Sequence, residues 1–223
     1  MTYRHEWKYQ ISRADAISLR PGLRAVMKPD PHASDGTYTV RSLYFDTPGD
    51  KALREKINSV NTREKFRIRY YNGDTGFIQL EKKFKCNGLG IKEKARLTAA
   101  EAQSIAIGDI GWMPRSPNPL VRELYAKMRT TGLHAKTIVE YTREAYAWEP
   151  GNARVTLDSG IRTSLRNTHL LDPQCPTIPI AGNPIILEVK WDRFLPDIIR
   201  DVVQVGNRRV GAFSKYAESR MYE

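Results

Sequence analysis

One stretch of the sequence carries a cationic side chain at every second position. Between residues 64 and 71, Lys65, Arg67 and Arg69 alternate with aromatic and aliphatic residues. Side chains two apart on an extended strand share a face and lie about 7 Å apart. Arg67 and Arg69 could therefore hold neighbouring groups of an extended polyanion. A solvated edge strand that uses charge to resist aggregation gives the same pattern, so this stretch alone leaves both interpretations open.

The same alternation recurs in most of the predicted strands. Each has one apolar face and one face of Lys, Arg and an occasional acid. If the apolar faces pack against helices, a closed antiparallel barrel would point the charged faces at one another across a lumen. Cations confined in this way predict a bound polyanion, and the few carboxylates among them predict a bound metal cation. The polar faces carry Glu6, Lys8, Arg67, Arg69, Glu81, Lys83, Lys85, Lys92, Lys94, Arg143, Arg154, Asp158, Glu188 and Lys190.

Phosphate chains and a hard metal ion fit this set of side chains. Arginine offers forked donors to phosphate, and lysine offers a mobile point charge. Glutamate oxygens suit Mg²⁺ or Mn²⁺. The four histidines form no recognisable ligand cluster, and Cys86 and Cys175 have no metal-like spacing. We therefore expect no zinc site, and we interpret the cysteines as free thiols.

The composition predicts a globular protein with anionic partners. The 223 residues are 40% hydrophobic, and 36 Lys and Arg face 25 Asp and Glu. The cations alternate with apolar residues on strands instead of clustering on a helix, which argues against a nucleic-acid partner. The N-terminal sequence shows no signal peptide and no apolar run is long enough to span a bilayer. We therefore expect a cytoplasmic protein with no transmembrane segment.

The predicted elements form one α+β domain over residues 1–223 with mostly antiparallel strands. Ser12 is predicted to cap the first helix, Thr98 with Glu101 to cap another, and Gly132 to end the helix at 120–129. Pro21 is expected to kink or divide the first helix. The last helix is expected to turn Ile198, Ile199, Val202 and Val203 inward. Strands are expected at 4–11, 38–46, 64–71, 77–85, 90–97, 137–146, 153–158 and 184–191, and helices at 12–27, 51–57, 98–107, 120–129 and 195–205.

Eight short motifs occur in series along nearly the whole chain. They resemble, in type and order, the VTC (vacuolar transporter chaperone) domain, the polyphosphate polymerase branch of the CYTH/triphosphate tunnel metalloenzymes. No single motif is specific, but the series makes coincidence improbable. The motifs are Arg4-x-Glu6-x-Lys8-Tyr9, Arg41-Ser-Leu-Tyr-Phe-Asp46-Thr47, Lys65-x-Arg67-x-Arg69-Tyr70, Leu80-Glu81-x-Lys83, Tyr141-x-Arg143, Arg154-Val-Thr-Leu-Asp158, Leu187-Glu188-Val-Lys190 and Ser214-Lys215-Tyr216.

The resemblance implies a closed tunnel of eight antiparallel strands with helices packed on the outside. It assigns Mn²⁺ or Mg²⁺ to Glu188, with Glu6 either supporting the metal or orienting Lys8. The residues it places on the phosphates are Lys8, Arg67, Arg69, Lys83, Arg143, Arg154 and Lys215. Further phosphate-binding residues would be Lys85, Lys92, Lys94, Lys190 and Ser214.

The implied activity is transfer of the γ-phosphate of ATP to a growing polyphosphate chain. Arg4 departs from hydrolytic relatives, which carry the first Glu of a Glu-x-Glu-x-Lys motif here, and this departure resembles the polymerase branch. A metal-dependent triphosphatase on the same tunnel and a non-catalytic polyanion-binding module stay open as alternatives. The chain lacks the membrane and regulatory segments of eukaryotic relatives, so we expect a stand-alone bacterial catalytic domain. A separate membrane partner is compatible with it.

Overall fold

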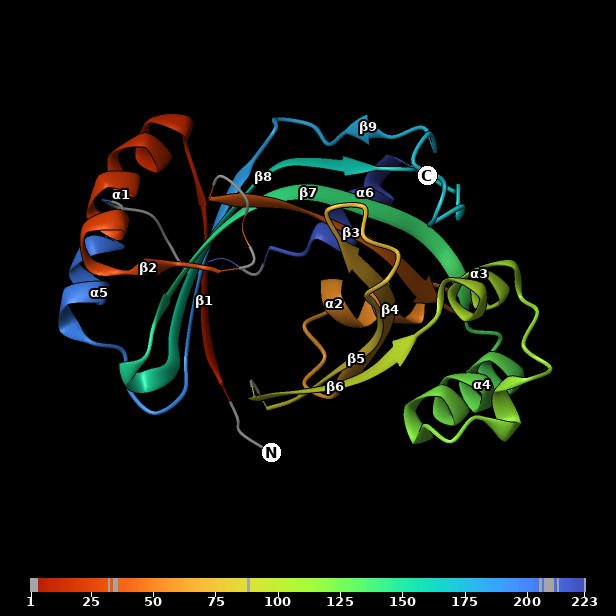
Figure 1. The fold of residues 1–223 in the computed structure, drawn as a ribbon. Coiled ribbons are helices and arrows are strands. Elements are labelled where there is room, and N and C mark those ends of the chain that lie inside the picture. Colours follow the sequence, from red (N-terminus) through yellow and green to blue (C-terminus); the bar gives the residue numbers. More distant parts are fainter. Residues whose placement is uncertain are drawn as a thin grey trace. The chain divides into compact units, whose positions relative to one another are not determined.

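The structure, a computed structural model, describes residues 4–31, 33, 36–87, 89–204, 206, 211 and 213–222. The chain forms two compact units. Unit 1 consists of Met1–Thr39, Tyr141–Ile161 and Pro179–Phe213, and unit 2 of Val40–Glu140, Arg162–Ile178 and Ser214–Glu223. The hydrogen-bonded strand order is β1-β10-β8-β7-β3-β4-β5-β6, with β2 beside β7 and β9 beside β8 (Figure 1).

The mostly antiparallel α+β class is confirmed by the strand pairing. Strands β3, β7 and β8 contribute residues to both units. Closure of the strand order into a tunnel and the single domain over 1–223 stay predictions. The bounds of the strands are β1 His5–Ile11, β2 Lys28–Pro29, β3 Thr37–Asp46, β4 Arg63–Tyr71, β5 Ile78–Cys86, β6 Leu89–Leu97, β7 His134–Trp148, β8 Ala153–Thr163, β9 Ile178–Pro179 and β10 Ile185–Trp191.

The first four helices lie close to the predicted ranges, α5 is shorter than predicted, and α6 was not predicted. Thr98 and Glu101 form the predicted capping box of α3. Within the described residues, no helix is long and apolar enough to cross a membrane. The bounds are α1 Arg13–Val26, α2 Lys51–Ile57, α3 Ala99–Ile107, α4 Pro119–Thr131, α5 Asp197–Val202 and α6 Lys215–Ser219, with η1 Met113–Arg115, η2 Pro150–Asn152 and η3 Arg220–Tyr222.

Unit 1 buries one face of its strands against two helices that lie side by side, α1 and α5 (Figure 1). Side chains alternate across a strand, so burial of one face leaves the other face polar. In β10, Leu187 and Val189 belong to the buried core, and Glu188 lies on the opposite face between them. The core contains Ile11, Ala16, Leu19, Leu23, Met27, Tyr146, Val155, Leu157, Leu187, Val189, Ile199 and Val203.

Helix α1 begins at the predicted cap. The Asp15 backbone N–H donates to the Ser12 hydroxyl at 3.1 Å, and the Ser12 N–H donates to the Asp15 carboxylate at 2.8 Å. Pro21 was expected to kink or divide this helix. It does not divide it, because α1 runs unbroken from 13 to 26, and a kink stays a prediction. Leu19 and Leu23 are buried in the same core on either side of Pro21. Their packing holds the helix together across the missing N–H group.

Two further expectations for unit 1 are corrected. Helix α5 is shorter than predicted, and Ile198 is 48% exposed instead of facing inward. A helix of less than two turns has only one narrow stripe on its core side. Ile199 and Val202 occupy it, and Val203 directly after the helix is also buried, as predicted. The prolines of segment 28–36 predict a loop, but its first two residues form the short strand β2. Lys28 and Pro29 pair with Ala147 and Tyr146 of β7.

Unit 2 packs the apolar face of β3 to β6 against α3 and α4. Phe66 and Ile68 of the cationic strand are almost completely buried there. Helix α4 ends at Gly132, whose φ of 67° supplies the left-handed cap predicted for it. The core contains Leu43, Phe45, Phe66, Ile68, Tyr70, Ile78, Leu80, Ala95, Leu97, Ala102, Ile105, Ala106, Met113, Leu120, Val121, Leu124, Ile138, Leu170 and Cys175. The opposite face of these strands is the polar one.

Candidate functional site

The polar face of β4, β5 and β6, here called the cationic face, holds one acid among many cations. The antiparallel register places its side chains in cross-strand rows. Glu81 is the one carboxylate on this face of the three strands, which are described except at Gly88 between β5 and β6. Like charges directly opposite one another destabilise a sheet. This face therefore costs stability, and a bound anion would offset that cost. The rows are Lys65–Lys83–Lys92, Arg67–Glu81–Lys94 and Arg69–Gln79–Arg96.

Arg67 is held from two sides in the middle of the cationic face. Its Nε donates to Glu81 Oε2 at 2.6 Å, and its Nη1 donates to the Tyr44 hydroxyl at 3.1 Å. The Lys92 ammonium contacts the other oxygen of Glu81. Burial opposes ionisation of Glu81, but the charges of Arg67, Arg69 and Lys92 hold its pKa well below the ordinary value. Glu81 therefore stays ionised and fixes the position of Arg67.

Lys92 is a cation that gives up its proton easily. Burial of the ammonium group and the charge of Arg67 lower the pKa of Lys92 to about 7, although Glu81 acts in the opposite direction. A polyanion placed beside Lys92 would favour the protonated form and raise this pKa. The charge that the cationic face carries thus depends on what is bound to it.

The other predicted residues on the cationic face differ in how deeply they lie. Arg69 is buried, and its Nε donates to the Ser42 hydroxyl at 2.8 Å. Lys83 and Lys85 of β5 are half-buried, and Lys94 of β6 is exposed. The structure therefore brings all the predicted phosphate-binding residues of β4 to β6 onto one face. Their role in phosphate binding stays a prediction.

Tyr44 belongs to this arrangement, although the sequence reasoning did not single it out. It lies opposite Arg67 in the register of β3 and β4 and is 3% exposed. Its ring stacks on Tyr216 with centroids 5.2 Å apart. Burial on its own raises the pKa of Tyr44, but Arg67, Lys65 and Arg69 lower it to about 7. The signal that could have identified Tyr44 is its alternation with Ser42 and Asp46, which predicts that the three side chains share a polar face.

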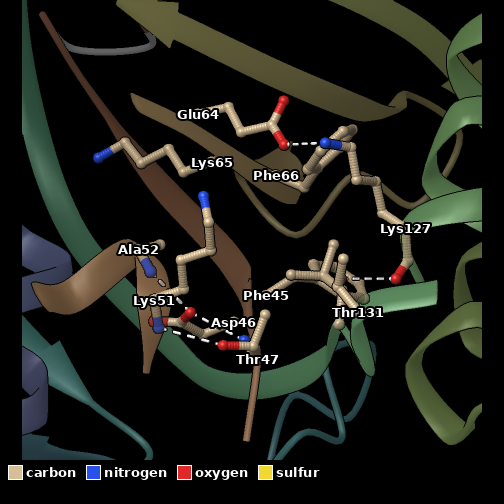
Figure 2. Close-up of a pocket in the computed structure, with 11 residues that line it drawn as sticks. Phe45, Asp46, Thr47, Lys51, Ala52, Glu64, Lys65, Phe66, Lys127 and Thr131 are labelled. Carbon is tan, nitrogen blue, oxygen red and sulfur yellow. Dashed lines mark hydrogen bonds and ion pairs between the residues drawn. The ribbon is translucent and has the colours of Figure 1, made fainter. Parts of the chain in front are cut away.

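The motif Ser214-Lys215-Tyr216 begins α6 and joins it to the start of α2. The Ser214 hydroxyl accepts from the Ala217 backbone N–H at 3.3 Å and so caps α6. The Tyr216 hydroxyl donates to Asp46 at 2.6 Å. Figure 2 shows Asp46 at the start of α2, where its carboxylate also accepts from the Ala52 N–H at 2.8 Å. Lys215 is the first residue of α6 and is half-buried.

A small pocket in unit 2 lies beside this junction (Figure 2). Three lysines contribute to its wall. The Lys127 ammonium pairs with Glu64, and the Lys51 ammonium lies 2.5 Å from Glu55. Lys65 extends to the ring of Tyr44, with its ammonium 5.6 Å from the ring centroid. Glutamates thus neutralise two of the three lysines, and the third, Lys65, belongs to the cationic face.

Unit 1 holds a second group of charges, here called the carboxylate cluster, around Glu188 and Glu6. The Lys8 ammonium lies 3.0 Å from Glu6 Oε1 and 3.1 Å from Glu188 Oε1. The Lys190 ammonium lies 2.6 Å from Glu188 Oε2 and 3.7 Å from Glu6 Oε1. Three neighbouring strands supply this arrangement, because Glu188 of β10 lies opposite Lys8 of β1 and Thr156 of β8.

Arg143 and Asp158 complete the carboxylate cluster. The Arg143 Nε and Nη2 donate to the two oxygens of Asp158 at 2.6 and 2.8 Å. Arg143 Nη2 also lies 3.9 Å from Glu188 Oε2. Asp158 shares a predicted polar face with Arg154 and Thr156, which is compatible with a structural hydrogen bond or with a role in the site. The structure makes it the bidentate partner that orients Arg143, and Asp158 is completely buried.

The ionisation of the carboxylate cluster follows from these contacts. Burial raises the pKa of Glu188, but Lys190, Lys8 and Arg143 outweigh burial and hold it well below the ordinary value. Burial lowers the pKa of Lys8, but Glu188 and Glu6 raise it above the ordinary value. Burial wins at Lys190, whose pKa is lowered despite the charge of Glu188. Glu188 is thus an ionised carboxylate at neutral pH.

A divalent metal ion fits the oxygen donors of this cluster. The Thr156 hydroxyl, across the strand from Glu188, is buried with no hydrogen-bond partner in the structure. The described residues contain no group of three or more acids, histidines or cysteines that could hold a metal. Mg²⁺ binds through one or two carboxylates together with substrate phosphates. Glu188 and Glu6 are the two carboxylates that could serve in this mode, and their role as metal ligands stays a prediction.

Two arginines of the predicted motifs are tied to loops of unit 1. Arg4 Nε lies 2.7 Å from Asp192, and Arg4 Nη2 donates to the Asn152 carbonyl at 2.6 Å. Arg154 Nη2 donates to Asp30 at 2.6 Å and to the Tyr38 hydroxyl at 2.7 Å. Arg4 therefore acts as a clamp at the end of β1. Arg154 lies across from Lys190 on the polar face of β8, with its guanidinium engaged by unit 1 itself.

Comparison with the profiles of known protein families identifies the family of this chain. The VTC domain profile matches residues 3–222. The chain belongs to the VTC domain family. This VTC domain has no match among curated proteins.

Two solved structures share the fold of this VTC domain. HpAC1 from Hippeastrum, described as an adenylyl cyclase candidate with a dominant triphosphatase activity, is 14% identical and has a TM-score of 0.58 over 100% of this chain and 97% of its own. The bh2851 protein from Bacillus halodurans, described as a candidate adenylate cyclase, is 14% identical and has a TM-score of 0.50 over 89% of this chain and 86% of its own. At this identity the likeness concerns the fold alone, and it confirms the predicted α+β class with an antiparallel sheet and helices outside it.

Proposed function

We propose that this VTC domain transfers the γ-phosphate of ATP to the end of an inorganic polyphosphate chain. The observation that carries the proposal is the cationic face, where rows of Lys and Arg surround the single buried carboxylate of Glu81. A folded protein gains nothing from such a face unless an anion occupies it. An extended phosphate chain carries negative charge at each unit along its length. It therefore complements a face on which cations are repeated along and across the strands.

Phosphoryl transfer asks little covalent help from the protein. It requires in-line positioning and neutralisation of the charge on the transferred group. Arg67 and Arg69 offer forked donors for the γ-phosphate, and Glu81 and Ser42 fix their orientation. A terminal oxygen of the acceptor phosphate forms a bond to the γ-phosphorus as the bridging bond to the β-phosphate breaks. The electron pair leaves with ADP. A phosphate at a chain end is already largely ionised, so the step needs no general base.

Within unit 1, the carboxylate cluster supplies groups of the kind that phosphoryl transfer uses. Glu188 and Glu6 are the residues that would hold Mn²⁺ or Mg²⁺, and a bound ion would neutralise charge on phosphate oxygens. Lys8, Lys190 and Arg143 would contribute cations to the phosphates. Arg4 is bonded to Asp192 and adds no carboxylate beside Glu6. This favours a site with few metal ligands and, with it, transfer over hydrolysis.

One assay tests the proposal against its alternatives. Pure protein is incubated with ATP and Mn²⁺, and long-chain polyphosphate is separated from free phosphate on a gel. We expect polyphosphate chains with the wild type and with Lys127→Gln, a change outside the cationic face, and their loss in Arg67→Ala. Free phosphate without chains would indicate a triphosphatase. If neither product forms and duplex DNA binds more tightly than tripolyphosphate, the phosphate-handling function itself is wrong.

A further inference from the structure

Tyr44 is a phenol bonded directly to an arginine of the cationic face. Its hydroxyl accepts from Arg67 Nη1 at 3.1 Å, while Arg67 also bonds Glu81. The Arg67 guanidinium carbon and the Lys65 ammonium lie 5.9 and 5.6 Å from the centroid of its ring. Tyr216 stacks on the same ring. Tyr44 is thus packed by cations on one side and by a neutral ring on another.

The groups that face Tyr44 come from several elements of unit 2. Strand β4 contributes Lys65, Arg67 and Arg69, which lower the pKa of Tyr44. Glu81 of β5 and Lys92 of β6 act on it through Arg67 and the bridge that they share. Helix α6 contributes Tyr216, whose own pKa is raised by burial and by its hydrogen bond to Asp46. Tyr216 therefore stays neutral, and Tyr44 is the phenol of this pair that titrates.

We propose that Tyr44 is a positioning residue for Arg67 and an internal counter-charge of the cationic face, which takes up a proton when a phosphate chain binds. The inference rests on the proposed function. Without a ligand, a phenolate at Tyr44 partly neutralises Arg67, Lys65 and Arg69. Phosphate oxygens on the same cations repel the phenolate, because like charges disfavour ionisation. The phenolate oxygen then accepts a proton from solvent, and the neutral hydroxyl still accepts the hydrogen bond from Arg67.

The coupling between phosphate binding and protonation is reciprocal. If binding raises the pKa of Tyr44, then protonation of Tyr44 strengthens phosphate binding by the same factor. Each unit by which the pKa rises corresponds to about a tenfold change in affinity. The pKa of Tyr44 without ligand, about 7, lies well below that of an ordinary tyrosine. Affinity for a phosphate chain is therefore expected to fall as the pH rises through neutrality.

The near-ultraviolet absorbance of tyrosinate tests the charge state of Tyr44 directly. We expect the wild type to gain about one tyrosinate near neutral pH, and saturating tripolyphosphate to remove this gain. Tyr44→Phe should lack the neutral titration, whereas Tyr125→Phe on α4 should keep it. The wild-type titrations with and without tripolyphosphate give the answer even if Tyr44→Phe fails to fold. A flat wild-type titration, or one that tripolyphosphate does not move, overturns the inference.

The pH dependence of tripolyphosphate binding provides the second readout. From about pH 6 to about pH 9, we expect wild-type affinity to fall at least about tenfold more than that of Tyr44→Phe. Titration calorimetry in buffers of different ionisation heat should show proton uptake on binding in the wild type and less uptake in the variant. Equal pH profiles would overturn the inference while leaving the proposed function in place. Failure of the wild type to bind tripolyphosphate at any pH would overturn both.

Discussion

The two charged regions of this VTC domain use the same residue types in opposite proportions. In the carboxylate cluster of unit 1, three acids meet three cations, and every cation contacts an acid. On the cationic face of unit 2, one acid is shared by Arg67 and Lys92 among many further cations. Glu6, Glu188 and Asp158 oppose Lys8, Lys190 and Arg143 in the first region.

This difference separates stability from binding. A buried charge that loses its partner destabilises the fold strongly, so the carboxylate cluster should be sensitive to any single change. Removal of a cation from the cationic face relieves repulsion and removes a ligand contact at the same time. We therefore expect substitutions in unit 1 to act first on the free energy of unfolding. Substitutions on the cationic face should act first on anion affinity.

The largest expected effect concerns Arg143. Arg143→Met leaves the fully buried Asp158 without its bidentate partner, and we expect a loss of about 3–5 kcal/mol in the free energy of unfolding. Arg67→Met is the matched change on the cationic face. Because Glu81 keeps Lys92 as a partner, its cost should be about 1 kcal/mol. Urea denaturation of both variants measures these values, and equal losses would break the comparison.

Ligand stabilisation should distinguish the regions next. Tripolyphosphate at about one hundred times its dissociation constant should stabilise the wild type by about 2.7 kcal/mol. Arg67→Met and Arg69→Met should lose most of this gain, because the forked donors for phosphate are gone. Lys127→Gln on α4 serves as the control and should retain it. A shift of the thermal midpoint with added tripolyphosphate is the measurement, and an undiminished shift in Arg67→Met would contradict the assignment.

Acidification should affect both regions through their carboxylates. The pKa values of Glu188 and Glu81 are held below the ordinary value in the folded state. The stability they contribute is therefore present above their unfolded pKa of about 4.3 and is lost as the pH falls below it. We expect the wild-type free energy of unfolding to drop below about pH 5. Glu188→Gln and Glu81→Gln should each remove about one proton from that pH dependence.

The two glutamine variants should differ in their anion binding. Glu81→Gln removes the only acid on the cationic face, so tripolyphosphate should bind more tightly than to the wild type. Glu188→Gln should instead weaken Mn²⁺ binding. The electron paramagnetic resonance signal of free Mn²⁺ measures this affinity. Weaker tripolyphosphate binding in Glu81→Gln would mean that the orientation of Arg67 matters more than the net charge of the face.

The smallest expected effect is at the exposed edge of the cationic face. Lys94 is exposed on β6, so Lys94→Gln should weaken tripolyphosphate binding by about threefold and leave stability unchanged. Lys28 of unit 1 is also exposed and lies 3.6 Å from Glu149. Lys28→Gln should change neither quantity. Binding isotherms of the wild type and both variants at two salt concentrations measure these effects. The affinity lost in Lys94→Gln should be smaller at the higher salt concentration.

The sequence by itself determined the faces of the strands and most of the helix ends. Side chains alternate across a strand with a period of two. Once residues 64–71 form a strand, Lys65, Arg67 and Arg69 must share a face. The Ser12 and Thr98 caps were readable for the same reason, because a capping box spans only four residues. Local geometry also marked Gly132 as a helix end. These features depend on neighbours along the chain.

Only the tertiary structure decided which charge meets which partner. Arg143 bonds Asp158, Arg4 bonds Asp192, and Arg67 lies between Glu81 and Tyr44. Strand register and long connections set these pairs, and a shift of one residue would turn each side chain to the other face. Pro21 and Ile198 show the same limit of local patterns. Core packing within unit 1 kept α1 continuous through Pro21, and the shortness of α5 left Ile198 exposed. The sequence thus determined that one strand would carry a row of cations, and the fold determined that Glu81 would hold the middle one, Arg67.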